Sequence, residues 1–204
     1  RVKNFMNYQI MDQMKEYEAD FDQMLFYLPL SGSTFKKVYY DDLLERAVSK
    51  FVPADDLVVP YTATSLDDAE SVIHVVKMSE NELRKQMVSG FYSDIELTKP
   101  TGTITNELEE KEREVGGVTK SQRTDPLYTI LECHVDLDLE GFEDLGPDGE
   151  PTGIKLPYVV TIEEGSRKVL SIRRNFAPND PKKNKIQYFV HFKFLPGLGF
   201  YGLG

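Results

Sequence analysis

The sequence predicts an α+β protein, with a helix-plus-strand N-terminal unit followed by a β-rich antiparallel unit. Apolar residues recur at helical spacing before residue 32, whereas short alternating segments and Gly-containing turns dominate after residue 126. A charged, glutamate-rich stretch lies between these parts and has almost no large apolar residue. We therefore expect a unit at 1–97, an acidic variable linker or insertion at 98–125, and a β-rich unit at 126–204.

The chain is predicted to start with one amphipathic helix or two nearly collinear helices. Residues three or four positions apart define its apolar side: Ile10, Met14, Tyr17, Phe21, Met24 and Leu28. Pro29 and Gly32 are expected to end this helical region.

Short strands and one capped helix are expected next. The strands are rich in aromatic and β-branched residues and cover 35–41, 56–59 and 71–77. Ser79 and Glu82 have the spacing of a capping box, which predicts a helix over 80–89 that stops at Gly90.

The second half is predicted to be mostly β. Its expected strands are 127–139, 158–162, 169–173 and 185–194, with turns at 148–149 and 164–165. In the last of these strands, alternation puts Tyr188, Val190, Phe192 and Phe194 on the expected core face. Gln187, His191 and Lys193 fall on the other face, and a glycine-rich hinge follows.

Charge is unevenly distributed along the chain. The net charge is −10, yet residues 166–193 contain eight Lys or Arg and one Asp, a local charge of +7. An acidic chain of this kind is unlike a general nucleic-acid coat, whose basic face must neutralise phosphates. The predicted partner or DNA contact residues are Arg167, Lys168, Arg173, Arg174, Lys182, Lys183 and Lys185. A solvated basic loop is the plain alternative.

One strand carries a possible metal-ligand set. Alternation places Glu132, His134, Asp136 and Asp138 on one face, and these residue types bind Mn, Zn or Mg. A metal-dependent hydrolase or nuclease is therefore the alternative function. Alternation is equally typical of a half-buried strand whose polar side faces water, which is the interpretation we prefer. A calcium loop starting at Asp136 fails because its twelfth position would be Pro147.

Other chemistry-bearing patterns are weak. Gly197, Gly199 and Gly202 spell G-x-G-x-x-G, but Pro196, Phe200 and Tyr201 crowd this loop, so we expect a hinge and not a dinucleotide fingerprint. His74 and His191 lie in apolar strands and are expected to be hydrogen-bonded sheet histidines. No G-x-S-x-G or P-loop motif is present, and the single cysteine, Cys133, allows no intrachain disulfide.

Six segments, taken in order, resemble the central part of portal proteins of podovirus-type tailed bacteriophages: 22–41, 51–61, 74–92, 131–144, 151–162 and 187–202. The resemblance covers nearly the whole chain and is weakest over 98–125. It implies a portal wing and clip, with no enzymatic activity, no catalytic or metal-binding residues and no cofactor.

The resemblance also implies partners and a location. The family forms a ring of twelve subunits at one capsid vertex, assembled in the host cytoplasm, through which double-stranded DNA is packaged and ejected. The partners it implies are large terminase, tail or head-completion adaptors, and capsid and scaffolding proteins, with no membrane. Both ends of the chain read as cut from a longer protein, and a long stem helix is expected beyond Gly204.

Overall fold

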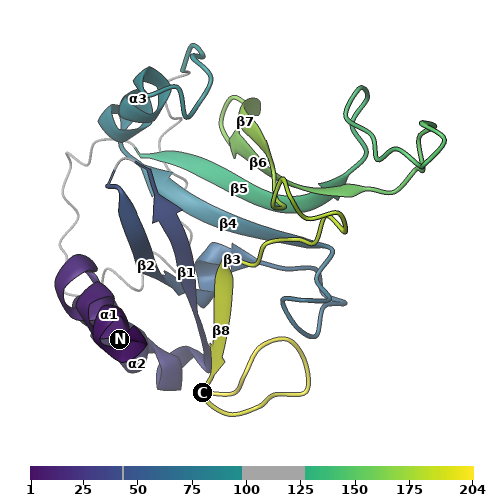
Figure 1. Cartoon of the computed structure of the whole chain (residues 1–204). Coiled ribbons are helices and arrows are strands. Elements are labelled where there is room, and N and C mark those ends of the chain that lie inside the picture. Colours follow the sequence, from purple (N-terminus) through teal and green to yellow (C-terminus); the bar gives the residue numbers. More distant parts are fainter. Residues whose placement is uncertain (43, 98–126) are drawn as a thin grey trace. The chain divides into compact units, whose positions relative to one another are not determined.

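The computed structural model describes residues 1–42, 44–97 and 127–204 (Figure 1). N-terminal helices are followed by two antiparallel sheets, so the α+β prediction is confirmed. The acidic segment predicted at 98–125 lies outside the described residues.

Contacts divide the chain into two compact units that interleave in sequence. Unit 1 contains Arg1–His74, Cys133–Tyr158 and Arg174–Gly204, and unit 2 contains Val75–Glu132 and Val159–Arg173. Each unit therefore takes residues from both sides of the acidic segment. These contact-based units cut across the expected boundaries of 1–97 and 126–204.

The helical region of unit 1 consists of α1 (Val2–Tyr8), a π-helical turn (Gln9–Gln13) and α2 (Tyr17–Ser31). All six residues of the predicted apolar side are buried or half-buried, and Met24 is only 1% exposed. Pro29 lies inside α2, so the prediction that it ends the helix was wrong. Gly32 ends the helix instead, with a φ of 72° that favours glycine.

Unit 1 also contains a three-stranded sheet ordered β2-β1-β8, built from β1 (Ser33–Asp41), β2 (Arg46–Pro53) and β8 (Phe189–Lys193). Phe35 pairs with Val52 on one side and His191 on the other. Phe35 belongs to the main apolar core, whose buried members are Phe35, Val52, Leu57, Ala63, Leu66, Ala69, Val72, Phe189 and Phe200.

Helix α2 is fixed to the edge strand β2 by polar contacts. The Asp20 carboxylate accepts a hydrogen bond of 3.0 Å from the Phe51 N–H. Glu16 accepts one of 2.8 Å from Arg46, and this bond is the main reason that the pKa of Glu16 is lowered. Since β2 is at the edge of its sheet, Asp20 occupies a backbone donor that no strand takes.

The second sheet has five strands in the order β3-β4-β5-β6-β7. Their bounds are β3 Leu57–Val58, β4 Ser71–Met78, β5 Tyr128–Leu137, β6 Leu156–Glu163 and β7 Lys168–Arg174. All the predicted strands are present, although β8 is shorter than expected. The strand β2 was not predicted.

Unit 2 contains the predicted capped helix, α3 (Glu80–Val88). Ser79 accepts from the Glu82 N–H, and the Glu82 carboxylate accepts from the Ser79 N–H, which confirms the capping box. The buried core of this unit is formed by Leu83, Tyr92, Tyr128, Ile130 and Leu170.

Two strand faces differ from the prediction. In β8 the buried residue is Phe189, at 2% exposure, whereas Val190 is 48% exposed, so the expected core face was the wrong one. In β5 the expected water-facing side contains His134, which is 4% exposed. Both strands carry large side chains on both faces, so tertiary packing decides which face is buried.

Candidate contact site

The predicted basic contact residues fall in both units. Arg167, Lys168 and Arg173 belong to unit 2, whereas Arg174, Lys182, Lys183 and Lys185 belong to unit 1. Their closeness in the sequence therefore does not by itself make them one surface, and the residues of the two units have different neighbours.

In unit 2, two of the predicted contact residues hold the segment that follows α3. The Lys168 Nζ donates to the Glu96 carbonyl at 3.1 Å. The Arg173 guanidinium donates to the Phe91 carbonyl at 2.8 Å and lies 3.5 Å from the centre of the Phe91 ring. Because both cations have intramolecular acceptors, they are less available to a partner than their charge suggests.

Arg167 differs from these two residues. It occupies the turn between β6 and β7, with a φ of 57°, and it is exposed. Among the described residues, no hydrogen bond or ion pair engages its side chain. Arg167 is therefore the available cation among the predicted contact residues of unit 2.

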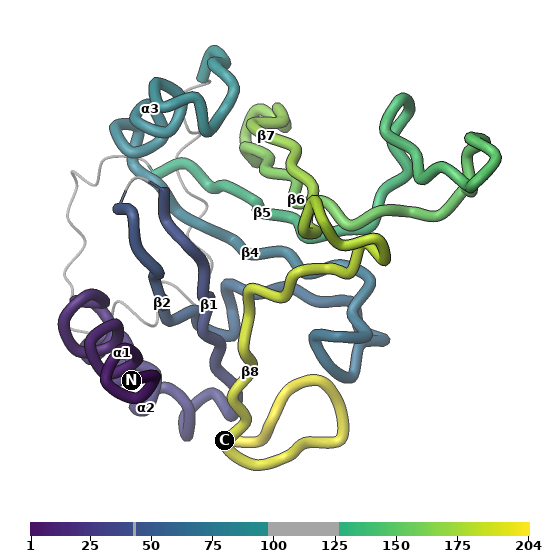
Figure 2. The backbone as a smooth tube through the Cα atoms, viewed as in Figure 1, coloured from purple at the N-terminus to yellow at the C-terminus, as the bar shows by residue number. Residues whose placement is uncertain are grey.

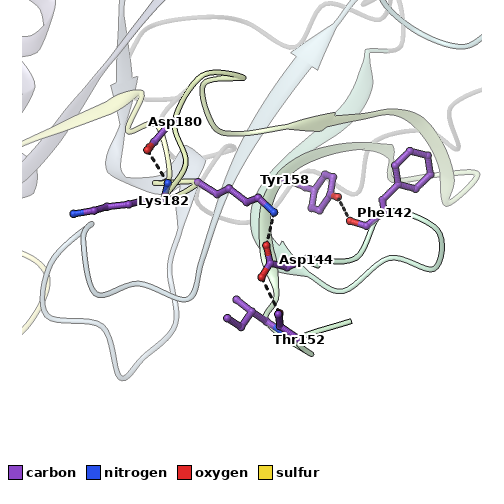
Figure 3. Close-up of polar contacts among 8 residues, drawn as sticks. Phe142, Asp144, Thr152, Tyr158, Asp180 and Lys182 are labelled. Atoms are coloured by element: carbon purple, nitrogen blue, oxygen red, sulfur yellow. Dashed lines mark hydrogen bonds and ion pairs between the residues drawn. The ribbon is translucent and has the colours of Figure 1, made fainter. Parts of the chain in front are cut away.

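In unit 1, Lys183 joins two loops that are distant in sequence, and Figure 3 labels its partner Asp144. Its ammonium group forms an ion pair with Asp144, which also accepts from the Thr152 hydroxyl at 2.8 Å. These two bonds, that from Lys183 first, lower the pKa of Asp144. The Tyr158 hydroxyl donates to the Phe142 carbonyl at 3.3 Å in the same loop. The segment between β5 and β6 is thus cross-linked to the basic loop.

The basic loop is shaped by Asp180. Its carboxylate accepts from the Lys182 N–H and the Asn184 N–H, both at 3.0 Å, and these backbone bonds lower its pKa. Lys185 is held as well, because its Nζ donates to the Ala69 carbonyl at 3.1 Å. Lys183 and Lys185 therefore stabilise the loop.

Two cations of unit 1 have no acceptor within the part of the chain that the structure describes. The Lys182 side chain is exposed, and Figure 3 shows it pointing away from the Lys183–Asp144 contact. Arg174 is exposed and lies 5.9 Å from the Phe142 ring and 6.0 Å from the Phe176 ring. Aromatic neighbours orient a guanidinium without neutralising it. Among the predicted contact residues of unit 1, Arg174 and Lys182 are therefore the available cations.

Sequence reasoning missed Asp144 and Thr152. Asp144 and Lys183 are 39 positions apart, and no short-range spacing predicts their contact. The only signal was the opposite charge of the two loops, since residues 140–150 contain five Asp or Glu and no Lys or Arg.

The residues of the possible metal site are not gathered as ligands. Across the described ranges, no group of three or more His, Cys, Asp or Glu side chains is arranged to hold a metal ion. His134 packs against the rings of Tyr188 and Phe189, with centroids 5.6 and 5.2 Å away. Glu132 is half-buried, whereas Asp136 and Asp138 are exposed. The hydrolase alternative thus has no ligand cluster in the described structure.

His191 is a hydrogen-bonded sheet histidine, as predicted. Its Nε2 lies 3.0 Å from the hydroxyl of the fully buried Ser33, and its ring stacks on Phe35 and Phe200 with centroids 4.4 and 4.8 Å away. Burial, with a smaller contribution from the charge of Lys193, lowers the pKa of His191 to about 4. Since Ser33 is inaccessible, this pair is structural.

The G-x-G-x-x-G segment forms a closed loop that returns beside the start of β1 (Figure 2). Leu195 and Leu203 form a bridge, and the Gly202 N–H donates to the Ser33 hydroxyl at 2.7 Å. A Cβ atom at Gly197 would collide with the Tyr201 carbonyl, and one at Gly202 with the Gly32 carbonyl. These two glycines are needed for backbone packing, which explains the spacing without a nucleotide.

Comparison with known proteins adds no family assignment. Within the described ranges, no helix has both the length and the apolar composition needed to cross a membrane. No family model matches the chain, and no curated protein matches it either.

Proposed function

We propose that this chain is the wing and clip part of a tailed-phage portal subunit. In this proposal it has no catalytic role and acts through assembly into a ring of twelve at one capsid vertex. The ring conducts DNA during packaging and ejection, and it binds large terminase first and tail or head-completion adaptors later. The proposal rests on the six resembling segments, which occur in order along the chain.

One structural observation supports an assembly role above all. Large apolar side chains are exposed on α1, on α2 and on the loop after β8, including Phe5 at 59%, Phe26 at 67% and Leu198 at 111%. Large exposed apolar areas commonly mark contacts with other proteins. A subunit that is covered by neighbouring molecules in a ring would bury such apolar side chains.

The charge of the chain also agrees with a conduit for DNA. Twelve copies at −10 would give a ring of about −120, and acidic surfaces repel phosphates within a Debye length of roughly 8–10 Å. A passage lined with many cations would instead bind DNA tightly and in a salt-dependent manner. The available cations Arg167, Arg174 and Lys182 then suit acidic surfaces of terminase or adaptors.

Negative-stain imaging of the full-length protein that contains this chain tests the proposal directly. We expect twelve-fold rings. A full-length protein that stays monomeric at high concentration would refute the proposal.

Charge reversal then tests the contact residues. We expect Arg174→Glu with Lys182→Glu to weaken terminase capture and to leave DNA affinity and its salt dependence unchanged. The matched control is Lys50→Glu, which changes an exposed lysine of β2. Reduced DNA affinity with a shallower salt slope would make these residues a nucleic-acid contact instead.

A further inference from the structure

Strand β8 lies at one edge of the sheet β2-β1-β8, so it pairs with a strand on one side only. In an antiparallel ladder, hydrogen-bonded residue pairs alternate with pairs that are not hydrogen-bonded. The Val38 N–H donates to the Tyr188 carbonyl at 2.8 Å, and the Phe194 N–H donates to the Gly32 carbonyl at 3.0 Å. The even-numbered residues of 188–194 therefore direct their backbone groups toward β1.

The odd-numbered residues of β8 direct their backbone groups outward, away from β1. The Phe189 N–H has an acceptor already, because the side-chain oxygen of Gln187 lies 3.4 Å away. Five other outward groups have no hydrogen bond to any residue in 1–42, 44–97 or 127–204. They are the carbonyl of Phe189 and the N–H and carbonyl groups of His191 and Lys193.

This open stretch of β8 has a defined length. At one end it is bounded by the contact of Gln187 with the Phe189 N–H. At the other end Leu195 is already paired, since it exchanges two backbone hydrogen bonds of 3.2 and 2.8 Å with Leu203. Outward groups on one edge of a strand recur about every 6.6 Å, a spacing that another extended chain matches. The open stretch therefore fits a short added strand.

The opposite edge of the same sheet is blocked. The Phe51 N–H of β2 donates to the Asp20 carboxylate at 3.0 Å. The Ser49 N–H makes a backbone hydrogen bond to the Glu16 carboxylate. Both acceptors lie at the start of α2, so side chains of the helical region take the donors that an added strand would need. Of the two edges of this sheet, β8 is therefore the one that is open to strand addition.

The open stretch lies in a positively charged part of an acidic chain. Residues 33–40 and 189–193 contain three lysines and no Asp or Glu, although the net charge of the chain is −10. Lys193 is exposed, and its Nζ donates to the Gly199 carbonyl at 3.5 Å. A neutral acceptor at this distance leaves the charge of Lys193 in place. A strand that carries carboxylates is thus electrostatically complementary to this edge.

The other face of β8 is apolar at the same edge. Val190 and Phe194 are 48% and 49% exposed, and they lie on the face opposite to Lys193. Apolar side chains of an added strand would pack against them as cross-strand neighbours. A second copy of β8 is a poorer match, because two such edges would bring lysines together without a carboxylate.

We propose that the open stretch of β8 binds an extended segment of a partner protein in which apolar and acidic residues alternate. The segment adds a strand to the sheet. Its backbone pairs with His191 and Lys193, its apolar residues cover Val190 and Phe194, and its carboxylates face Lys193. This contact goes beyond the proposed function, since strand addition does not require a ring.

A synthetic peptide tests the backbone pairing. The probe is a capped peptide of alternating valine and glutamate, added in excess to the nitrogen-15-labelled chain. We expect hydrogen exchange at the His191 and Lys193 amides to slow at least tenfold, with nuclear Overhauser contacts to the peptide. The matched controls are N-methylated at one or the other alternate set of residues. Only one set faces β8, so one control should lose binding and the other should retain it. Equal binding by both controls, or unchanged exchange with the probe, would overturn the proposal.

Charge substitutions test the kind of partner. Lys193→Glu should bind the probe at least tenfold more weakly, whereas Lys50→Glu, on the blocked edge strand β2, should bind it as the wild type does. A valine–lysine peptide should prefer Lys193→Glu to the wild type. If it binds the wild type as tightly as the valine–glutamate probe, the acidic partner is wrong. Protection of the same amides that rises with protein concentration, without peptide, would make a second copy the occupant and overturn the proposal.

Discussion

Acidification should destabilise unit 1 through His191. The ordinary pKa of histidine is 6.5, and burial lowers that of His191 to about 4. Between these values the unfolded chain takes up a proton that the folded chain does not, so stability is lost as the pH falls from 6.5 toward 4. A shift of about 2.5 pKa units corresponds to about 3.4 kcal/mol in full. Since His191 is only half-buried, solvent screening reduces the expected loss to about 1–2 kcal/mol.

The assay is urea unfolding at pH 7.0, 5.5 and 4.5 for the wild type and for His191→Gln. Glutamine does not titrate, and its amide can still hydrogen-bond to the Ser33 hydroxyl. Carboxylates with lowered pKa values, such as Asp144 and Asp180, also lose stabilising contacts in acid, but they affect both proteins equally. We therefore expect the stability difference between wild type and variant to shift by about 1–2 kcal/mol in favour of the variant between pH 7.0 and 4.5. A pH-independent difference would refute the argument.

Three other substitutions test contacts described above. Asp20→Ala should lower the free energy of unfolding by about 1–2 kcal/mol, because the Phe51 N–H loses a charged acceptor. Urea unfolding measures this loss of stability, and Asp20→Asn should recover part of it. Ser79→Ala should cost about 1 kcal/mol by removing the cap of α3, and an unchanged melting profile would show that the cap is dispensable. Lys183→Met should raise the pKa of Asp144 toward its ordinary value, and carbon-detected NMR titration of the carboxyl group measures this change. A pKa that stays low would mean that the hydrogen bond from the Thr152 hydroxyl is sufficient to lower it.

The sequence predicted elements whose signal is local. The apolar side of α2, the capping box of α3 and most strands depend on spacing within a few residues, and the structure confirms them. The strand β2 was missed because its buried residues Val48 and Val52 are four positions apart, and this spacing fits a helix as well as a strand. Its strand conformation comes from pairing with β1.

Local sequence does not show which of the basic residues are bound within the molecule. Charge density along the chain identified seven cations, but it could not show that Lys168, Arg173, Lys183 and Lys185 are engaged within the molecule. Their acceptors are two backbone carbonyls 72 and 82 positions away, a carboxylate 39 positions away and a carbonyl 116 positions away. Contacts between residues this far apart in the sequence form only through the tertiary fold, so local spacing does not predict them.

The hydrogen bond from Phe51 to Asp20 has a consequence for solubility. An uncovered edge strand can template the addition of a strand from another molecule, which is a common start of aggregation. In β2 a helix carboxylate occupies a donor that such a strand would need. Helix α2 therefore hinders the addition of a strand at the β2 edge of this sheet.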